Sequence, residues 1–317
     1  MSAPTETAEV SACLRQYGRR LCGAVRRLPG GHVGQVNVVP TENGPLVAKR
    51  FGSRFTPERI ELAAQAHHHA ARAGLAPPLC LTRSGRRIAH VEDATYLVTE
   101  YIYHAQQAGL TCLGSALAAL HRCLDHFIPD QDCADFLQLP TPPTADLKRL
   151  RQQICDTTIR DAIDWRIHIL ETYGLDAQAM ATLSCGWVHG DARLENLVAA
   201  DPNRPLFVDF DQVSRFPRPY EIVRAFVTSI PPGMSAPDSA FRTYLDAYHR
   251  IRSIEATDRA VMIDLFITVQ AAESRTFTTT QDEVRGMSAF ARARHHQLTW
   301  VIDHRARLRR IAEEARP

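Results

Sequence analysis

Residues 187–211 constrain the fold and the chemistry of this chain most strongly, with the sequence WVHGDARLENLVAADPNRPLFVDFD. Asp191 follows His-Gly, Asn196 comes five residues later, and an apolar Leu-Phe-Val run ends at Asp209. A Pro/Asn turn at 201–203 separates two short apolar runs, and this pattern predicts a hairpin. The hairpin would return the loop that carries Asp191 and Asn196 to the side of Asp209.

The spacing of these polar residues suits phosphoryl transfer, which needs one carboxylate apart from a pair of metal-binding oxygens. Asp191 would orient and deprotonate an attacking hydroxyl, and Asn196 and Asp209 would bind Mg²⁺ on a nucleoside triphosphate. Each residue alone could cap a turn or end a strand, but capping does not link positions so far apart. We therefore predict Asp191 as the catalytic base and Asn196 and Asp209 as metal ligands.

The sequence HGDARLEN followed by VDFD resembles the aminoglycoside phosphotransferase and choline kinase-like family, whose members are small-molecule kinases. The resemblance implies a two-lobed α+β protein-kinase-like fold, with an antiparallel-sheet N-terminal lobe at residues 1–101 and a mainly helical C-terminal lobe at 102–317. It also implies ATP, or another nucleoside triphosphate, and Mg²⁺ as cofactors. Asp211 stands where protein kinases have Gly, and it is a candidate for an extra metal or water ligand.

Lys49 stands out because the chain contains only two lysines, Lys49 and Lys148, but 35 arginines. It lies in the apolar run LVAKRF. A lysine in such a strand indicates a need for a compact point charge, such as a contact to phosphate oxygens. The alternative is a lysine whose side chain merely reaches from the strand to solvent. The family resemblance implies that Lys49 contacts the α- and β-phosphates.

A glycine-rich turn precedes the lysine strand. Gly30, Gly31 and Gly34 would let the backbone approach nucleotide phosphates, between expected strands at 22–28 and 35–39. The turn is neither a full G-x-G-x-x-G motif nor a P-loop, because no Gly-Lys-Ser/Thr sequence occurs in the chain. Rossmann and P-loop chemistry are therefore disfavoured.

A helix is predicted over residues 56–73, with a Thr-Pro start and a following glycine that stops it. In the family a glutamate of this helix pairs with the lysine and holds it toward the phosphates. Glu58 and Glu61 lie three apart on nearly the same face, and we favour Glu61 as the partner of Lys49. The alternative is that both acids only complement the helix dipole.

The strand predicted at 79–82, the strand at 88–91 and the run 95–102 lead to a polar loop. The last of these resembles the hinge between kinase lobes, and the resemblance implies that backbone groups of Glu100 and Ile102 hydrogen-bond adenine. The alternative is that Glu100 simply ends a strand.

Helical periodicity dominates the rest of the chain. Helices are expected over 113–127, 145–173, 176–183, 241–252, 258–275 and 287–315, and another from Pro219. Few residues separate Asp211 from Pro219, which leaves no room for a long activation segment that holds a peptide. A protein substrate is therefore disfavoured. The resemblance implies that these helices build the acceptor pocket.

The composition is that of a soluble globular protein, with 45% hydrophobic and 23% charged residues and a net charge of +2. This charge argues against a nucleic-acid or membrane-surface partner, and no apolar run reaches the roughly 20 residues that span a bilayer. The N-terminal sequence has no apolar core ahead of a cleavage site, so we expect no secretory signal and a cytoplasmic location.

Two residue types invite metal or disulfide hypotheses. The eight cysteines include no Cys-x-x-Cys pair, and we expect reduced, mostly buried thiols. His67, His68 and His69 are consecutive, so on a helix they point in different directions and do not predict a metal site.

The predicted function is transfer of the ATP γ-phosphoryl group to a hydroxyl of a small molecule, by a monomer or a homodimer. The resemblance suggests an aminoglycoside-like antibiotic or another amino-bearing hydroxyl compound; an amino alcohol, homoserine or a sugar is the alternative. Residues 221–317 include 12 acidic and 14 basic residues, which favours an acceptor with few positive charges. Glu273, Asp282 and Glu283 could still gather near it. A non-catalytic nucleotide-binding regulator is the alternative from another class.

Overall fold

The computed structural model describes the chain over residues 4–28, 34–103, 106–138, 144–199, 201, 204–231, 233–277 and 287–315. The chain forms two compact units. Unit 1 comprises Met1–Ala108, Ala119–Phe136 and His189–Ser214, and unit 2 comprises Gly109–Ala118, Leu137–Val188 and Arg215–Pro317. The predicted lobe boundary at residue 101 lies near the end of the first stretch of unit 1, and the catalytic stretch from His189 onward packs within that same unit.

An antiparallel sheet of five strands forms the frame of unit 1, in the order β1-β2-β3-β5-β4. Its strands are β1 Arg26–Arg27, β2 Gly34–Thr41, β3 Gly44–Phe51, β4 Ile88–Val91 and β5 Ala94–Glu100. The antiparallel sheet predicted for the N-terminal part of the chain is therefore confirmed. Lys49 lies near the end of β3, opposite Val36 in β2 and Leu97 in β5.

Two predicted strands are shorter than expected. The run 22–28 contributes only β1, because Pro40 of β2 accepts a bond from the Cys22 N–H at 3.0 Å but has no N–H to complete the ladder. The run 79–82 contributes a single bridge, between Leu79 and Thr99.

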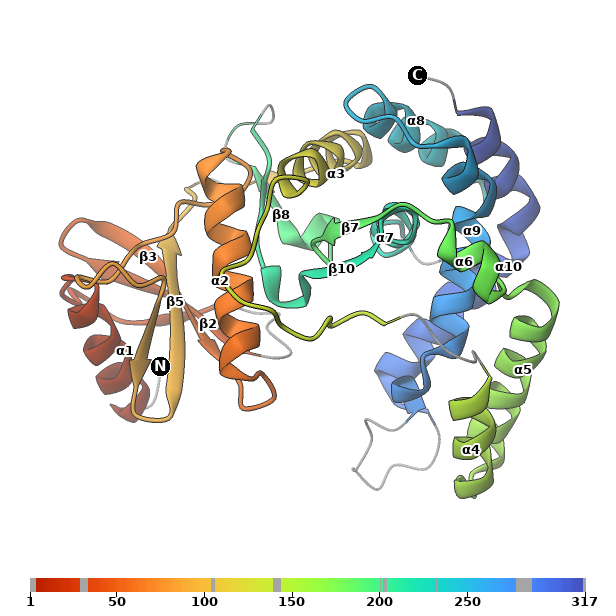
Figure 1. Cartoon of the computed structure of the whole chain (residues 1–317). Helices are drawn as coiled ribbons and strands as arrows, with labels where there is room; N and C mark the ends of the chain where they lie inside the picture. Colours follow the sequence, from red (N-terminus) through yellow and green to blue (C-terminus); the bar gives the residue numbers. More distant parts are fainter. Residues whose placement is uncertain are drawn as a thin grey trace. The chain divides into compact units, whose positions relative to one another are not determined.

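The two faces of the sheet are covered by two helices, α1 (Pro4–Gln16) and α2 (Pro57–Arg72) (Figure 1). Neighbouring residues of a strand point to opposite faces. Val98 of β5 accordingly belongs to a hydrophobic cluster that includes residues of α1. Leu97 belongs to a second hydrophobic cluster, which includes residues of α2. Lys49 lies opposite Leu97, so its side chain leaves the sheet on the α2 side.

Helix α2 begins and ends where its sequence predicts. The Thr56 side chain accepts a hydrogen bond from the Arg59 N–H at 3.3 Å, and Pro57 occupies the first turn. Gly74 follows the helix with a φ of 71°, a left-handed conformation that glycine adopts at little cost.

The predicted catalytic hairpin is confirmed. Strand β8 (Leu197–Ala199) pairs antiparallel with β9 (Leu206–Phe207), and β6 (Gln106–Gln107) pairs with the other edge of β8. Two short 3₁₀ turns flank the hairpin, η1 (Leu194–Asn196) before it and η2 (Phe210–Gln212) after it. The Val208 N–H donates to the Asn196 carbonyl at 2.9 Å, so the two ends of the hairpin lie side by side.

Unit 2 is mainly helical, as the C-terminal sequence predicts. Its helices are α4 Ala145–Gln153, α5 Thr157–Tyr173, α6 Ala177–Ala181, α7 Arg218–Val227, α8 Asp238–His249, α9 Ala256–Ala272 and α10 Ala289–Glu314, with the 3₁₀ turn η3 Ser274–Phe277. Strands β7 (Cys185–Val188) and β10 (Ser214–Pro217) form a two-stranded sheet, and α3 (Leu110–Leu124) contributes to both units. The helix expected at 145–173 is two helices, because Asp156 caps a new start by accepting from the Ile159 N–H at 3.1 Å.

Two observations concern the chain as a whole. No helix in the described ranges is both long and apolar enough to cross a bilayer. None of the eight cysteines forms a disulfide, but the expectation that most are buried is wrong, because only Cys13 is buried and the others are half-buried or exposed.

Candidate active site

His189 and Gly190 fix the start of the loop that carries Asp191. Gly190 has a φ of 83°, and a Cβ atom there would lie 2.0 Å from the Gln212 carbonyl oxygen, so only glycine fits. The fully buried His189 ring bonds through Nε2 to the Val208 carbonyl at 3.0 Å. Its Nδ1 then accepts from the Asp191 N–H at 3.3 Å, which matches a neutral imidazole protonated on Nε2. The histidine thus joins the loop to the far strand of the hairpin.

Asp191 is buried, and two side chains contact the Oδ2 atom of its carboxylate. The Asn196 Nδ2 donates to the Asp191 carbonyl at 2.9 Å and to its Oδ2 at 3.0 Å. The Arg193 Nε lies 3.5 Å from the same Oδ2. A carboxylate held in this way keeps one orientation, which a general base requires. The predicted Asp191 and Asn196 are therefore in direct contact.

Lys49 lies between two carboxylates of the segment that follows β9. Its Nζ is 2.5 Å from Asp209 Oδ1 and 2.6 Å from Asp211 Oδ1. The Lys49 and Asp211 side chains are 14% and 10% exposed, whereas that of Asp209 is 42% exposed. Asp209 also has a φ of 69° and a ψ of 61°, a left-handed conformation that costs about 1 kcal/mol or more for a residue with a Cβ.

The three charges shift one another's pKa values. Burial raises the pKa of Asp211 to about 6, because the attraction of Lys49 only partly offsets it and the Asp209 carboxylate adds to it. Burial also acts on Asp209, but its charge contact and hydrogen bond with Lys49 outweigh burial and lower its pKa. Burial alone would lower the pKa of Lys49, but the attraction of the Asp211 and Asp209 carboxylates is stronger, and the pKa of Lys49 is raised. The lysine is therefore firmly cationic.

The predicted metal ligands fit a divalent cation that arrives with phosphates. Asn196 uses its Nδ2 on Asp191, which leaves its Oδ1 as a hard oxygen donor. Asp209 already attracts a cation in the form of Lys49. In the parts of the chain that are described, no group of three or more His, Cys, Asp or Glu side chains is arranged as a metal site.

The predicted ion pair between Glu61 and Lys49 is wrong for this structure. Glu61 Oε1 instead accepts from Arg87 Nη1 at 2.9 Å. Glu58, the alternative partner, is exposed at the start of α2. The reason is the rotation of the helix: Arg59 faces the catalytic hairpin, and residues two positions apart on a helix point to nearly opposite sides.

Arg59 and His67 of α2 contact the η2 segment that follows the hairpin, and neither is predicted from the sequence. Arg59 Nε donates to the Asp211 carbonyl at 2.9 Å. The His67 ring packs edge-on against Phe210, with ring centroids 5.2 Å apart, and its Nε2 bonds to the Pro77 carbonyl at 2.8 Å. The period of the helix is readable in the sequence, but nothing in the sequence shows which stripe of α2 faces the hairpin.

The remaining nucleotide-site predictions have mixed outcomes. Gly30 and Gly31 lie outside the described residues. Gly34 begins β2, and a Cβ atom there would lie 2.6 Å from the Arg50 carbonyl and 3.8 Å from the Lys49 side chain, so the backbone passes close to the lysine.

Glu100 is exposed at the end of β5, and its N–H is already bonded to the Pro78 carbonyl at 2.9 Å. Ile102 follows it and is half-buried; the role of both residues in adenine binding stays a prediction.

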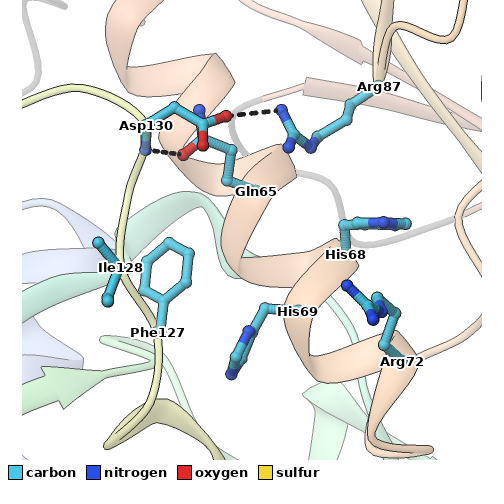
Figure 2. A pocket seen from close by; sticks show the side chains of 8 residues that line it. All are labelled: Gln65, His68, His69, Arg72, Arg87, Phe127, Ile128 and Asp130. Carbon is cyan, nitrogen blue, oxygen red and sulfur yellow. Dashed lines mark hydrogen bonds and ion pairs between the residues drawn. The ribbon is translucent and has the colours of Figure 1, made fainter.

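A separate pocket lies beside α2 (Figure 2). Arg87 points to Asp130 across one end of it, with their charged atoms 3.1 Å apart. His68 and His69 project in different directions, and His69 Nε2 is bonded to the Cys123 carbonyl at 3.0 Å. Its lining contains no predicted site residue and consists of Gln65, His68, His69, Arg72, Arg87, Phe127, Ile128 and Asp130.

Solved structures with the same fold cover nearly the whole chain. An aminoglycoside phosphotransferase from Alicyclobacillus acidocaldarius is 17% identical, with a TM-score of 0.64 over 99% of this chain and 98% of its own. A choline/ethanolamine kinase family protein from Mesorhizobium loti is 17% identical, with a TM-score of 0.65 over 98% and 99%. Amicoumacin kinase hAmiN, in complex with AMP-PNP, Ca²⁺ and Ami, is 13% identical, with a TM-score of 0.62 over 100% and 95%. These similarities confirm the predicted two-lobed α+β fold.

The sequence itself gives the family. No curated protein matches it. The phosphotransferase enzyme family matches over residues 24–254, which includes Lys49 and the whole catalytic hairpin. The predicted enzyme class, a small-molecule kinase, is thereby confirmed, and the chain belongs to the phosphotransferase enzyme family.

Proposed function

We propose that the chain transfers the γ-phosphoryl group of ATP, with Mg²⁺, to a hydroxyl group of a small molecule. One observation carries this proposal: Lys49 contacts Asp209 and Asp211 within the same unit that holds Asp191 against Asn196. Phosphoryl transfer needs little covalent chemistry from the protein, and it depends on positioning and on stabilisation of charge. These residues supply both.

Asp191 is the proposed general base. Its carboxylate is held by Asn196 at 3.0 Å, so an acceptor hydroxyl that reaches the carboxylate could give up its proton there. The proton would pass to Asp191 as the hydroxyl oxygen bonds to phosphorus and the bond to the leaving ADP breaks. Arg193, 3.5 Å from the same carboxylate, would help to keep the ionised carboxylate in one orientation.

Lys49 has to change partners when the nucleotide binds. In the free protein its ammonium group contacts both Asp209 and Asp211 and offsets part of their negative charge. Asn196 and Asp209 would hold the Mg²⁺, whose positive charge would neutralise the phosphates when bound. Lys49 would then be free to contact the α- and β-phosphates as a compact point charge, which a guanidinium does not imitate.

The proposed acceptor is an amino-bearing hydroxyl compound with few positive charges. Similarity to an aminoglycoside phosphotransferase and to a choline/ethanolamine kinase family protein supports this class of acceptor. In unit 2, Glu273 lies beside the buried Arg166, whose Nη1 donates to the Glu273 carbonyl at 3.3 Å. Residues 221–317 contain 12 acidic and 14 basic residues, and this balance favours a weakly charged acceptor over a polycation. Asp282 and Glu283 lie outside the described residues.

The test is a panel of acceptors with Mg²⁺ and ATP, in which ADP release and a phosphorylated product are both measured. The panel contains aminoglycosides, amino alcohols such as choline and ethanolamine, homoserine, and simple sugars. We expect one class to be phosphorylated on oxygen by the wild type and not by Asp191→Ala. Nucleotide binding without any phosphorylated product would support the regulator instead, and activity confined to a protein substrate would exclude the small-molecule proposal.

A further inference from the structure

The side chain of Arg59 joins α2 to the turn that carries the proposed metal ligand. It is 6% exposed and belongs to unit 1, like the turn it contacts. Its Nε and Nη2 donate to the Asp211 carbonyl at 2.9 and 2.8 Å, and Nη2 also donates to the Val213 carbonyl. One guanidinium thus binds two backbone carbonyls on either side of Gln212.

The turn held by Arg59 has a conformation that needs support. Asp209 adopts the left-handed region, with a φ of 69°, directly before η2. A residue with a Cβ keeps such a conformation only where the surrounding structure determines it. The two carboxylates of this turn both point to Lys49. Any relaxation of the backbone between Asp209 and Val213 would therefore move both carboxylates.

The stripe of α2 that faces the turn offers no acidic side chain. One and two turns after Arg59, at helical spacing, come Ala63, Ala66 and His67, all buried. The His67 ring packs on Phe210, inside the same turn. Helix α2 therefore contacts the site in two ways: the Arg59 guanidinium binds backbone carbonyls, and the His67 ring packs against the Phe210 ring. No carboxylate of this stripe contacts Lys49.

We propose that Arg59 is a positioning residue, which holds the turn from Asp209 to Val213 so that the carboxylates of Asp209 and Asp211 are placed for a metal–nucleotide complex. The inference deepens the proposed function and rests on it. Arg59 acts through the backbone of Asp211 and Val213 and touches no reacting atom. In this chain it provides the link between helix and catalytic site that a glutamate on α2 would otherwise provide.

The planar shape of the guanidinium is the feature to remove. Lysine keeps the charge but has a single ammonium group, which cannot span two carbonyls in the same way. Methionine keeps much of the length and removes the donors. Arg59→Lys and Arg59→Met are therefore the test variants. Arg72→Met is the matched control, because Arg72 is an exposed arginine at the other end of the same helix, outside the site.

Two measurements on these variants test the role of Arg59. The first is the affinity for Mn²⁺·AMP-PNP by calorimetry or by electron paramagnetic resonance of Mn²⁺. We expect it to fall about 10- to 100-fold in both Arg59 variants and to stay unchanged in Arg72→Met, as for residues that orient metal ligands. The second is amide hydrogen exchange of residues 209–213 in the nucleotide-free protein, which should become faster in the Arg59 variants only.

The two readouts separate the possible failures. Folded Arg59 variants with unchanged exchange at 209–213 and unchanged Mn²⁺·AMP-PNP affinity would overturn the positioning role. Equal acceleration of exchange throughout unit 1 would also overturn it, because Arg59 would then be only a general packing residue. A wild-type protein that does not bind Mn²⁺·AMP-PNP would instead contradict the proposed function, while the exchange at 209–213 would still decide whether Arg59 holds the turn.

Discussion

The catalytic hairpin and helix α2 belong to the same compact unit, but they differ in how well their site residues follow from sequence. In the hairpin, Asp191 contacts Asn196, and the backbone places Asn196 beside the strand that leads to Asp209. In α2, the helix begins and ends as predicted, yet Glu61 pairs with Arg87 and not with Lys49. The secondary structure was equally readable in both regions, so the difference lies elsewhere.

The difference lies in what fixes the direction of a side chain. A short hairpin fixes its own geometry, because strand pairing and a tight turn place residues close in sequence next to one another. A helix fixes only the relative directions of its side chains, and its rotation about its axis depends on what packs against it. On α2 the rotation is set by Ile60 and Ala64 against the sheet and by Arg59 against the hairpin.

Replacement of the proposed catalytic base tests the hairpin and has the largest expected effect. Asp191→Ala should lower turnover by about 10²- to 10⁴-fold, because the acceptor hydroxyl loses the group that takes its proton. Binding of ATP should stay nearly normal, which calorimetry with AMP-PNP would show. Near-normal turnover in the purified variant would show that Asp191 is not the base. The sequence would then have predicted the site residues of the hairpin no better than those of α2.

Replacement of the lysine tests the contact between sheet and hairpin. Lys49→Arg keeps the positive charge but spreads it over a larger plane, so it should misplace the phosphates and lower kcat/KM for ATP by about 10²-fold. Steady-state kinetics at saturating acceptor would measure this loss. A variant with the wild-type kcat and KM for ATP would show that the lysine is incidental, despite its two carboxylate partners.

The pH dependence of stability tests how His67 of α2 is buried. Burial lowers the pKa of its imidazole to about 4, below the ordinary value near 6.5, so the unfolded chain binds a proton more readily than the native protein. Stability should therefore be lost as the pH falls from 6.5 toward 4, by about 2 kcal/mol at pH 5 from this group alone. Urea unfolding of the wild type and His67→Gln at pH 7, 6 and 5 would measure the difference, and parallel pH profiles of the two proteins would contradict it.

Glu61 gives the smallest expected effect and the sharpest test of the rotation of α2. Glu61→Gln should change kcat/KM by no more than about twofold, because the carboxylate contacts Arg87 and not Lys49. Its ion pair is partly exposed and should contribute only about 0–1 kcal/mol to stability. A loss of activity as large as that of Lys49→Arg would mean that α2 rotates when the nucleotide binds and brings Glu61 to the lysine.

The sequence by itself determined the parts of this protein that depend on neighbours along the chain. The turn signals around β8 and β9 predicted the hairpin, and the Thr-Pro start and the glycine stop predicted α2. The order of the motifs predicted the family and the sheet-then-helices arrangement.

The tertiary structure alone decided which groups surround Lys49. Asp211 is a partner of the lysine only because the left-handed turn at Asp209 sends both carboxylates to one side. Arg59 is a site residue only because of the rotation of α2, which also sends Glu61 to Arg87. The contacts of Lys49 with Asp209 and of Arg59 with Asp211 join residues that are 160 and 152 positions apart. They arise from the packing of whole elements, whose rotation and separation no local pattern specifies.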